Sequence, residues 1–303
     1  MNTAKILLPL LVIAPCFALL QESDFKISTS VEMVLLDVAV QDSRGGYVSK
    51  LPKEAFRVEE NGVAQTIKAF SNADVPVEVG LVMDASGSMR TRRADVNAAG
   101  VAFVEKSNPE DQIFVVNFND TVKEGLPHSA PFTDSIDLLR KALSTGIPEG
   151  RTVLYDAIAE ALHHLDQGNR DKKTLVLVTD GGDNRSKIGL EQIMQMIIES
   201  HTTIYTVGIF DPEDPYSKPG VLRRIAAVSG GESFMPKTSA QVVPICEKIA
   251  KDIRNRYTLG YIPSRDAGAG VRKIKVTATA PDRGRLIVTS RTSYKLPENS
   301  VAK

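Results

Sequence analysis

The feature that most constrains the fold is a regular alternation of two sequence patterns between residues 75 and 256. Short runs rich in Val, Leu and Ile are typical of strands buried on both faces, and the stretches between them repeat apolar residues at helical spacing. This alternation predicts an α/β fold, a doubly wound and mostly parallel sheet with helices on both faces. The predicted strands cover residues 75–83, 113–118, 174–179 and 203–209, and the predicted helices cover 96–104, 136–143, 153–165, 190–198, 221–228 and 242–253.

The segments on either side of this region have strand patterns and no helical pattern of useful length. Residues 25–72 contain apolar runs and the hairpin signal Glu60-Asn61-Gly62-Val63, and residues 257–296 contain three more strand-like runs separated by turns. About three strands with one apolar face need a partner layer. We therefore expect the two segments to pair as a small β-sandwich-like domain, with 75–256 inserted between its halves or packed beside it.

Composition excludes several classes of protein. The chain has 303 residues, of which 42% are hydrophobic and 24% charged, so one or two domains with a full core are expected and disorder is not. The 37 basic and 37 acidic residues balance, and no basic block is present. A nucleic-acid partner is therefore not expected.

The first twenty residues resemble a secretion signal. A single Lys precedes an apolar run of about fifteen residues, which is short for a bilayer span and fits the core of a signal peptide. We predict export to a periplasmic, cell-surface or extracellular site. A membrane association is expected only if the segment is retained as an anchor or lipidated at Cys16, where Pro15 departs from the usual lipoprotein pattern.

Polar oxygen atoms follow the ends of two predicted strands. Asp84, Ser86 and Ser88 come directly after the run 75–83, and Asp180 follows the run 174–179. Open α/β sheets bind ligands at the carboxyl ends of their strands. An oxygen-only set suits Mg²⁺, Mn²⁺ or Ca²⁺ better than Zn²⁺, which prefers nitrogen and sulfur. Thr152, in the loop before the predicted helix 153–165, adds another hydroxyl.

The order D-x-S-x-S, then Thr at a helix start, then T-D-G after a strand resembles the metal-ion-dependent adhesion site (MIDAS) of von Willebrand factor type A (VWFA) domains. The resemblance implies that one divalent cation, Mg²⁺ by default, is bound by Asp84, Ser86, Ser88, Thr152 and Asp180, in part through water. The segments 37–40, 56–62, 257–261 and 272–276 also resemble the bacterial VWFA-related proteins of the acidobacterial type. That family supplies an architecture rather than an activity.

Plain structural roles compete with the metal site. Asp84, Ser86 and Ser88 are residue types that cap helices, and a helix is expected to begin near Arg90. Thr152 is another candidate cap, and Asp180-Gly181 fits ordinary turn chemistry.

The function that we expect is binding rather than catalysis, because the sequence lacks the common nucleophile, P-loop and zinc-protease motifs. Two carboxylates leave a divalent cation partly neutralised, and the resemblance implies that an Asp or Glu of a partner protein completes its shell. Arg90, Arg151, Asp183 and Arg185 are the expected rim of this contact, although Arg151 and Asp183 also fit solvated loop positions. Two alternatives stay open: a metal that only staples loops, and a Mg²⁺-dependent phosphoryl-transfer hydrolase.

Overall fold

The computed structural model describes residues 33–180, 182–210, 218–264 and 270–295. The predicted signal segment 1–20 lies outside these residues. No helix within the described ranges has both the length and the apolar character that crossing a bilayer requires.

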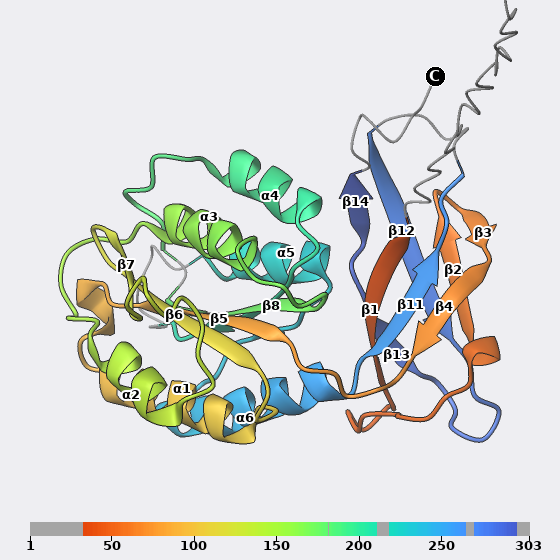
Figure 1. Cartoon of the computed structure of the whole chain (residues 1–303), viewed down its shortest axis with the longest axis horizontal. Coiled ribbons are helices and arrows are strands. Elements are labelled where there is room, and N and C mark those ends of the chain that lie inside the picture. Colours follow the sequence, from red (N-terminus) through yellow and green to blue (C-terminus); the bar gives the residue numbers. More distant parts are fainter. Residues whose placement is uncertain (1–32, 181, 211–217, 265–269, 296–303) are drawn as a thin grey trace, which may run out of the picture. The chain divides into compact units, whose positions relative to one another are not determined.

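A six-stranded sheet forms the centre of the region between residues 78 and 254 (Figure 1). Its strand order is β10-β9-β8-β5-β6-β7, and all neighbouring pairs are parallel except β6 and β7. The bounds are β5 Glu78–Asp84, β6 Gln112–Phe118, β7 Val122–Glu124, β8 Lys173–Thr179, β9 Thr203–Gly208 and β10 Ser233–Phe234. The middle strands are buried on both faces, as their continuous apolar runs predict.

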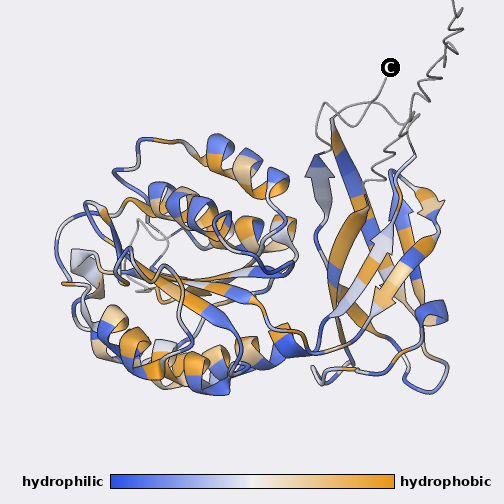
Figure 2. Ribbon diagram, in the orientation of Figure 1, coloured by the Kyte–Doolittle hydropathy of each residue, from blue (hydrophilic) through white to orange (hydrophobic). Residues whose placement is uncertain are grey.

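Six helices cover the two faces of this sheet. In Figure 1, α1, α2 and α6 lie on one face, and α3, α4 and α5 lie on the other. Their bounds are α1 Arg93–Lys106, α2 Ile136–Ser144, α3 Leu154–Leu165, α4 Leu190–Glu199, α5 Pro219–Ser229 and α6 Val242–Arg254. Hydrophobic residues run along the strands and along the helix sides that pack on them (Figure 2). The predicted α/β class with helices on both faces is confirmed.

The register of the parallel strands decides which residues share an edge of the sheet. Glu78, the first residue of β5, pairs with Gln112 of β6 and Lys173 of β8, so this edge carries the amino ends of three strands. Asp84 is the last residue of β5 and pairs with Phe118 at the end of β6. Side chains that follow β5, β6 and β8 therefore meet at the opposite edge.

The remaining strands form two four-stranded sheets, with orders β13-β1-β11-β4 and β14-β12-β2-β3. Strands from before and after the α/β region pair directly in both sheets, since β11 lies between β1 and β4, and β12 pairs with β2. The bounds are β1 Val34–Gln41, β2 Phe56–Glu60, β3 Val63–Gln65, β4 Ile67–Ser71, β11 Tyr257–Tyr261, β12 Val271–Ala278, β13 Ile287–Thr289 and β14 Ser293–Lys295.

These two sheets enclose a hydrophobic core of their own, and it contains a buried polar network. Glu60 Oε2 accepts hydrogen bonds from the hydroxyls of Tyr261 (2.7 Å) and Tyr294 (2.6 Å), and Glu60 Oε1 lies 2.7 Å from Arg272 Nη1. Tyr261 belongs to one sheet and Glu60 to the other. The network therefore links the two layers, and its charges are paired as buried charges must be.

Some local details differ from the predictions. The helix expected near Arg90 begins at Arg93 and is preceded by a 3₁₀ turn, Gly87–Met89. Strands β7, β10 and β14 were not predicted, because runs of two or three residues give no periodic signal. The hairpin signal is confirmed: Asn61 and Gly62 connect β2 to β3 with φ of 50° and 83°.

Candidate metal centre

Four of the five predicted ligand residues are in direct contact at the carboxyl edge of the sheet. Ser86 N donates to Asp84 Oδ1 at 2.8 Å, and the hydroxyl oxygens of Ser86 and Ser88 are 3.1 Å apart. Ser88 Oγ donates a short hydrogen bond to a carboxylate oxygen of Asp180. The loops after β5 and β8 therefore bring two carboxylates and two hydroxyls into one cluster.

Asp84 is completely buried. Its Oδ2 accepts a 2.6 Å hydrogen bond from Thr179 Oγ1. Burial, followed by the nearby Asp180 carboxylate, raises the pKa of Asp84 to about 6. Two carboxylates held this close in a buried place repel each other, and a cation relieves that repulsion.

Thr152 is brought to the same edge through the neighbouring loops. Its backbone N–H donates to Asn184 Oδ1 (3.0 Å), and Asn184 N–H donates back to the Thr152 carbonyl (3.1 Å). Gly87 N–H donates to the Gly150 carbonyl at 3.1 Å, which joins the first ligand loop to the loop that carries Thr152. Thr152 is buried, and backbone hydrogen bonds to Asn184 hold it in this loop.

The helix-capping alternative does not describe this cluster. Ser86 stands at the N-cap of the 3₁₀ turn but makes no side-chain capping bond. Helix α1 has Arg92 at its N-cap and α3 has Val153, in both cases without a side-chain cap. The Ser86 and Thr152 hydroxyls are therefore not engaged in helix caps.

The predicted rim residues are less uniform than the sequence suggested. Arg90 is exposed, and its Nη2 lies 3.4 Å from the Pro148 carbonyl. Arg151 is also exposed, with its backbone N–H on Asp120 Oδ1 at 3.2 Å. Arg185 Nε lies 3.5 Å from the same Asp120 oxygen, so an acidic residue that was not predicted partly neutralises this side of the rim.

Asp183 is directed toward the start of α3. Its Oδ1 accepts from Ser186 Oγ at 2.5 Å and from Tyr155 N–H at 3.4 Å. These bonds satisfy a backbone N–H at the helix N-terminus, which is a favourable place for a carboxylate. The position indicates a role in holding the loop after β8.

Sequence reasoning missed the residues that support the cluster. Arg93 is buried under the first ligand loop and donates to the Asp84 carbonyl (3.0 Å) and to Asn117 Oδ1 (2.6 Å). Thr179 and Asn184 hold Asp84 and Thr152 in place. Thr179 belongs to the T-D-G motif, so the sequence could have indicated it. The contacts of Arg93 and Asn184 form between segments that are distant in sequence, and no local motif marks them.

The donor set fits a hard divalent cation. Carboxylate and hydroxyl oxygens predominate, with neither His nor Cys among the five residues. The described residues contain no cluster of three or more His, Cys, Asp or Glu placed to hold a metal, so the hydroxyls of Ser86, Ser88 and Thr152 are needed to complete a shell.

Comparison with known proteins finds sequence relatives of this chain. Residues 79–182 match the family model of the von Willebrand factor type A domain. A curated relative, the thrombospondin-related anonymous protein of Plasmodium falciparum, is 32% identical over 135 residues. This match covers 40% of the present chain, and the chain spans about a quarter (24%) of that relative's length.

Solved structures share the fold at low sequence identity. A von Willebrand factor type A protein from Catenulispora acidiphila aligns with a TM-score of 0.55 and 16% identity, covering 83% of this chain and 75% of that one. The corresponding domain of the pilus tip protein Mfa5 from Porphyromonas gingivalis gives 0.51 and 16%, covering 60% and 96%. The proximal thread matrix protein 1 of the mussel byssus, in a form described as having a zinc-occupied MIDAS motif, gives 0.51 and 17%, covering 64% and 49%.

The finer likeness to the acidobacterial-type family stays a prediction. The matched segment shows the sequence likeness to this domain, and the solved structures show its fold. Residues 79–182 of this chain therefore match the von Willebrand factor type A domain, and the predicted metal-site motif lies at the carboxyl edge of the sheet in this region.

Proposed function

We propose that this protein is an exported, metal-dependent protein-binding module. Asp84, Ser86, Ser88, Thr152 and Asp180 would hold one divalent cation, directly or through water. When bound, the cation supplies a positively charged site that accepts a carboxylate from a partner protein. The rest of this edge of the sheet orients that partner.

The observation that carries the proposal is the contact chain from Asp84 through Ser86 and Ser88 to Asp180. Two buried carboxylates from two different strand ends share one cluster, and their proximity contributes to the raised pKa of Asp84. A fold that places like charges together in this way stabilises a cation at that position.

The surroundings of the cluster favour an acidic partner group. Arg90 and Arg151 are exposed beside it, whereas Arg185 is partly occupied by Asp120. We expect Arg90 and Arg151 to contribute more than Arg185 to the attraction of an Asp or Glu side chain. Such rim charges mainly affect the association rate and its salt dependence.

The identity of the metal is part of the proposal. Mg²⁺ is the first choice for an oxygen donor set, with Mn²⁺ and Ca²⁺ next. Because the mussel byssus protein has been described with zinc at its MIDAS motif, Zn²⁺ belongs in the same test.

Two alternatives are less well supported. A metal whose only role is to hold the loops together would contribute little to their stability, because backbone hydrogen bonds already join Gly87 to Gly150 and Asn184 to Thr152. A phosphoryl-transfer hydrolase with Asp84 as nucleophile would be helped by a second acid two residues later, and Ser86 occupies that position.

The proposal is tested by metal titration and partner capture with the same variants. Calorimetry should show that Asp84→Ala and Asp180→Ala weaken Mg²⁺ or Mn²⁺ binding by at least about tenfold, a change of about 1.4 kcal/mol. Asp183→Asn, in the same loop as Asp180, should bind the metal nearly as well as the unaltered protein, because Asp183 contacts α3 instead.

Partner capture from the envelope and secreted fractions of the source should depend on the same metal. Retention is expected in Mg²⁺, loss in EDTA, and recovery when Mg²⁺ is restored. A captured protein whose affinity is equal in EDTA and in Mg²⁺ would rule out a bridging metal and leave the staple alternative.

A further inference from the structure

A buried arginine lies against the loop that supplies three of the five predicted metal ligands. Arg93, the first residue of α1, is only 7% exposed. Its Nη1 donates to the Asp84 carbonyl at 3.0 Å, and its Nη2 donates to Asn117 Oδ1 at 2.6 Å and to the Leu143 carbonyl at 2.8 Å. One guanidinium therefore joins the end of β5, the end of β6 and the end of α2.

The hydrogen-bond acceptors of Arg93 are all neutral. Two are backbone carbonyls and one is a side-chain amide, so these bonds are not an ion pair. Its Nε is buried and has no hydrogen-bond partner in the described part of the chain. Burying a cation in this way costs free energy, and an apolar side chain of similar volume often packs at a lower cost. What an apolar side chain cannot do is fix the relative positions of three acceptors, because only the guanidinium holds its donors in a rigid planar fork.

Close packing keeps the guanidinium in place. A Cβ at Gly146 would lie 2.2 Å from Arg93 Nη2 and 2.6 Å from Asn117 Oδ1, so the loop after α2 approaches both side chains closely. Asn117 Nδ2 in turn donates to the Ala142 carbonyl (3.0 Å) and to Thr145 Oγ1 (3.2 Å). The end of α2 and the loop that follows it are thus tied to β6 through two side chains.

The loop that Arg93 holds is the one that leads to Thr152. Two backbone hydrogen bonds pair this loop with the first ligand loop, from Glu149 N–H to the Ala85 carbonyl (3.0 Å) and from Gly87 N–H to the Gly150 carbonyl (3.1 Å). Arg93 joins the same two loops at their base. It therefore sets the spacing between the loop after β5 and the loop that carries Thr152.

This spacing affects two hard cations differently. Mg²⁺ requires a nearly regular octahedron with short bonds, whereas Ca²⁺ accepts longer bonds and irregular arrangements. A shift of one ligand loop against the other therefore weakens Mg²⁺ binding more than Ca²⁺ binding. A change in nearby charge, or in the fraction of folded protein, changes the affinities for both divalent cations by nearly the same factor. The ratio of the two affinities thus reports on the geometry of the site.

We propose that Arg93 is a positioning residue that makes the predicted metal site selective for Mg²⁺ over Ca²⁺. It acts through the main chain of Asp84 and through the loop that leads to Thr152, rather than as a ligand. The inference rests on the proposed metal-dependent function and deepens it, because it names the residue that decides which cation the site prefers.

The test is calorimetric titration of the whole protein with Mg²⁺ and, separately, with Ca²⁺, before and after the change Arg93→Lys. Lysine keeps the positive charge but loses the planar fork. We expect the affinity for Mg²⁺ to fall at least about tenfold and the affinity for Ca²⁺ to fall less than about threefold. The ratio of the two affinities should then fall at least about threefold.

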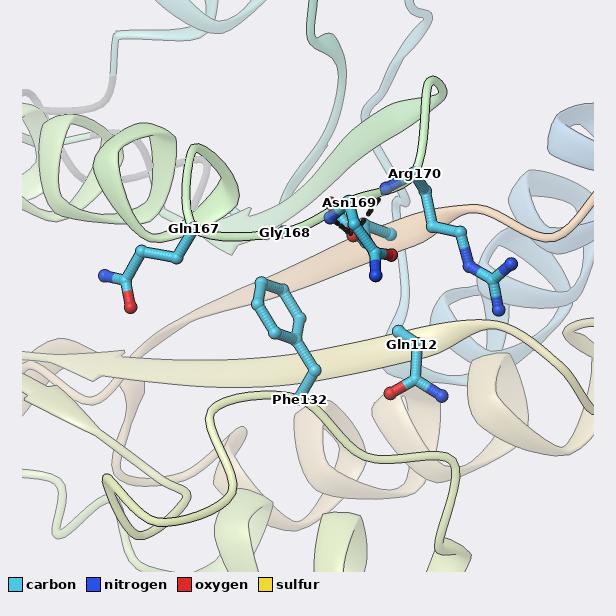
Figure 3. A pocket seen from close by; sticks show the side chains of 7 residues that line it. Gln112, Phe132, Gln167, Gly168, Asn169 and Arg170 are labelled. Carbon is cyan, nitrogen blue, oxygen red and sulfur yellow. Dashed lines mark hydrogen bonds between the residues drawn. The ribbon is translucent and has the colours of Figure 1, made fainter.

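Arg170→Lys is the matched control. Arg170 is a half-buried arginine at the amino edge of the same sheet, where it lines a cavity with Gln112, the first residue of β6 (Figure 3). Its Nη2 lies 3.4 Å from the Glu110 carbonyl, so it also contacts a neutral acceptor. The same change of residue type at this opposite edge should leave both metal affinities unchanged.

Asn117→Ala tests the same frame if Arg93→Lys does not fold. This change removes one acceptor of Arg93 and the bonds from Asn117 to the end of α2, while all five predicted ligands remain. The ratio of the Mg²⁺ and Ca²⁺ affinities should again fall.

The possible failures are distinguishable. A folded Arg93→Lys protein with an unchanged affinity ratio overturns this inference and leaves the proposed function intact. So does an unaltered protein that binds Ca²⁺ as tightly as Mg²⁺, a result that needs no variant. An unaltered protein that binds neither cation overturns the proposed metal-dependent function, and this inference with it.

Discussion

Individual buried carboxylates in this chain are held by quite different partners. Asp111 is 3% exposed and accepts bonds from the backbone N–H groups of Val77 (2.9 Å) and Asn108 (3.0 Å). Glu60 is paired with two tyrosine hydroxyls and an arginine, whereas Asp84 relies on Thr179, Ser86 and, in our proposal, a cation. Burying a charged carboxylate costs free energy, and its hydrogen-bond and charge partners compensate for part of that cost. The degree of compensation decides how the residue responds to pH.

Asp111 gives a prediction about the pH dependence of stability. Burial raises its pKa to about 6 despite its two backbone hydrogen bonds. Between about pH 4 and pH 6 the folded chain therefore holds this proton more tightly than the unfolded chain, and the contribution of Asp111 to the free energy of unfolding falls as pH rises through this window. Asp111→Asn, which cannot ionise, should lose that part of the slope.

Urea unfolding at several pH values between 4 and 7, in EDTA, measures this effect. Asp84 has a raised pKa of the same sign, so the variant should reduce the slope rather than abolish it. The exposed Asp171→Asn is a suitable control. An Asp111→Asn slope identical to that of the unaltered protein would show that Asp111 titrates equally in both states.

At the scale of single residues, the sequence predicts those site residues that belong to a short local motif. The D-x-S-x-S spacing and the T-D-G turn placed Asp84, Ser86, Ser88 and Asp180 together, and the structure brings them into contact. Asp120 was missed because its link to Arg185 joins segments 65 positions apart, and no local pattern marks such a contact.

At the scale of secondary structure, long apolar runs and helical repeats predicted the strands and helices of the α/β region within a few residues. Short edge strands such as β7 were not predictable, because their three residues form only through pairing with β6. The ends of elements also depend on packing: α1 begins three residues after Arg90, where the 3₁₀ turn has carried the chain past the ligand loop.

The central strand β5 gives a prediction about packing. A Cβ on Gly80 would lie 2.4 Å from Phe114 Cζ and 2.5 Å from Leu175 Cδ2. Gly80→Ala should therefore overpack the core and lower the free energy of unfolding by roughly 1–3 kcal/mol. Gly220→Ala, in α5 with nothing within 4 Å of the new methyl group, should instead raise it by roughly 0.5–1 kcal/mol.

Chemical denaturation of both variants measures the difference. Opposite signs are expected for the same change of residue type. A Gly80→Ala protein as stable as the unaltered one would mean that the aromatic ring and Leu175 relax at no cost.

At the scale of the whole molecule, the described residues form two hydrophobic cores with no shared residues. One core draws its residues from between positions 77 and 253, and the other from positions 34–58 and 257–294. The pairing of strands from the two ends of the chain was expected from their small size, but the partner strands and register follow from contacts that the sequence does not display. We propose that residues 75–256 are an independently folding unit.

Expression of residues 75–256 alone tests this division. Because its core is complete, the fragment should unfold cooperatively and bind Mg²⁺ within about threefold of the whole chain, a difference of about 0.7 kcal/mol. Circular dichroism and calorimetry measure both properties. A fragment that folds only when the flanking β segments are supplied would contradict the proposed boundary.

The pairing of Ser71 with Thr258, at the points where the chain enters and leaves the α/β region, has a mechanical consequence. Tension along the main chain through β1 and β14 loads the strand pairs of the two small sheets, and the β4–β11 ladder joins the two ends of the main chain of the α/β region. A pull on a ligand held at the carboxyl edge of the central sheet acts differently. This force reaches the β4–β11 ladder through the two chain segments that enter and leave the α/β region. Strands β4 and β11 therefore share the load in parallel.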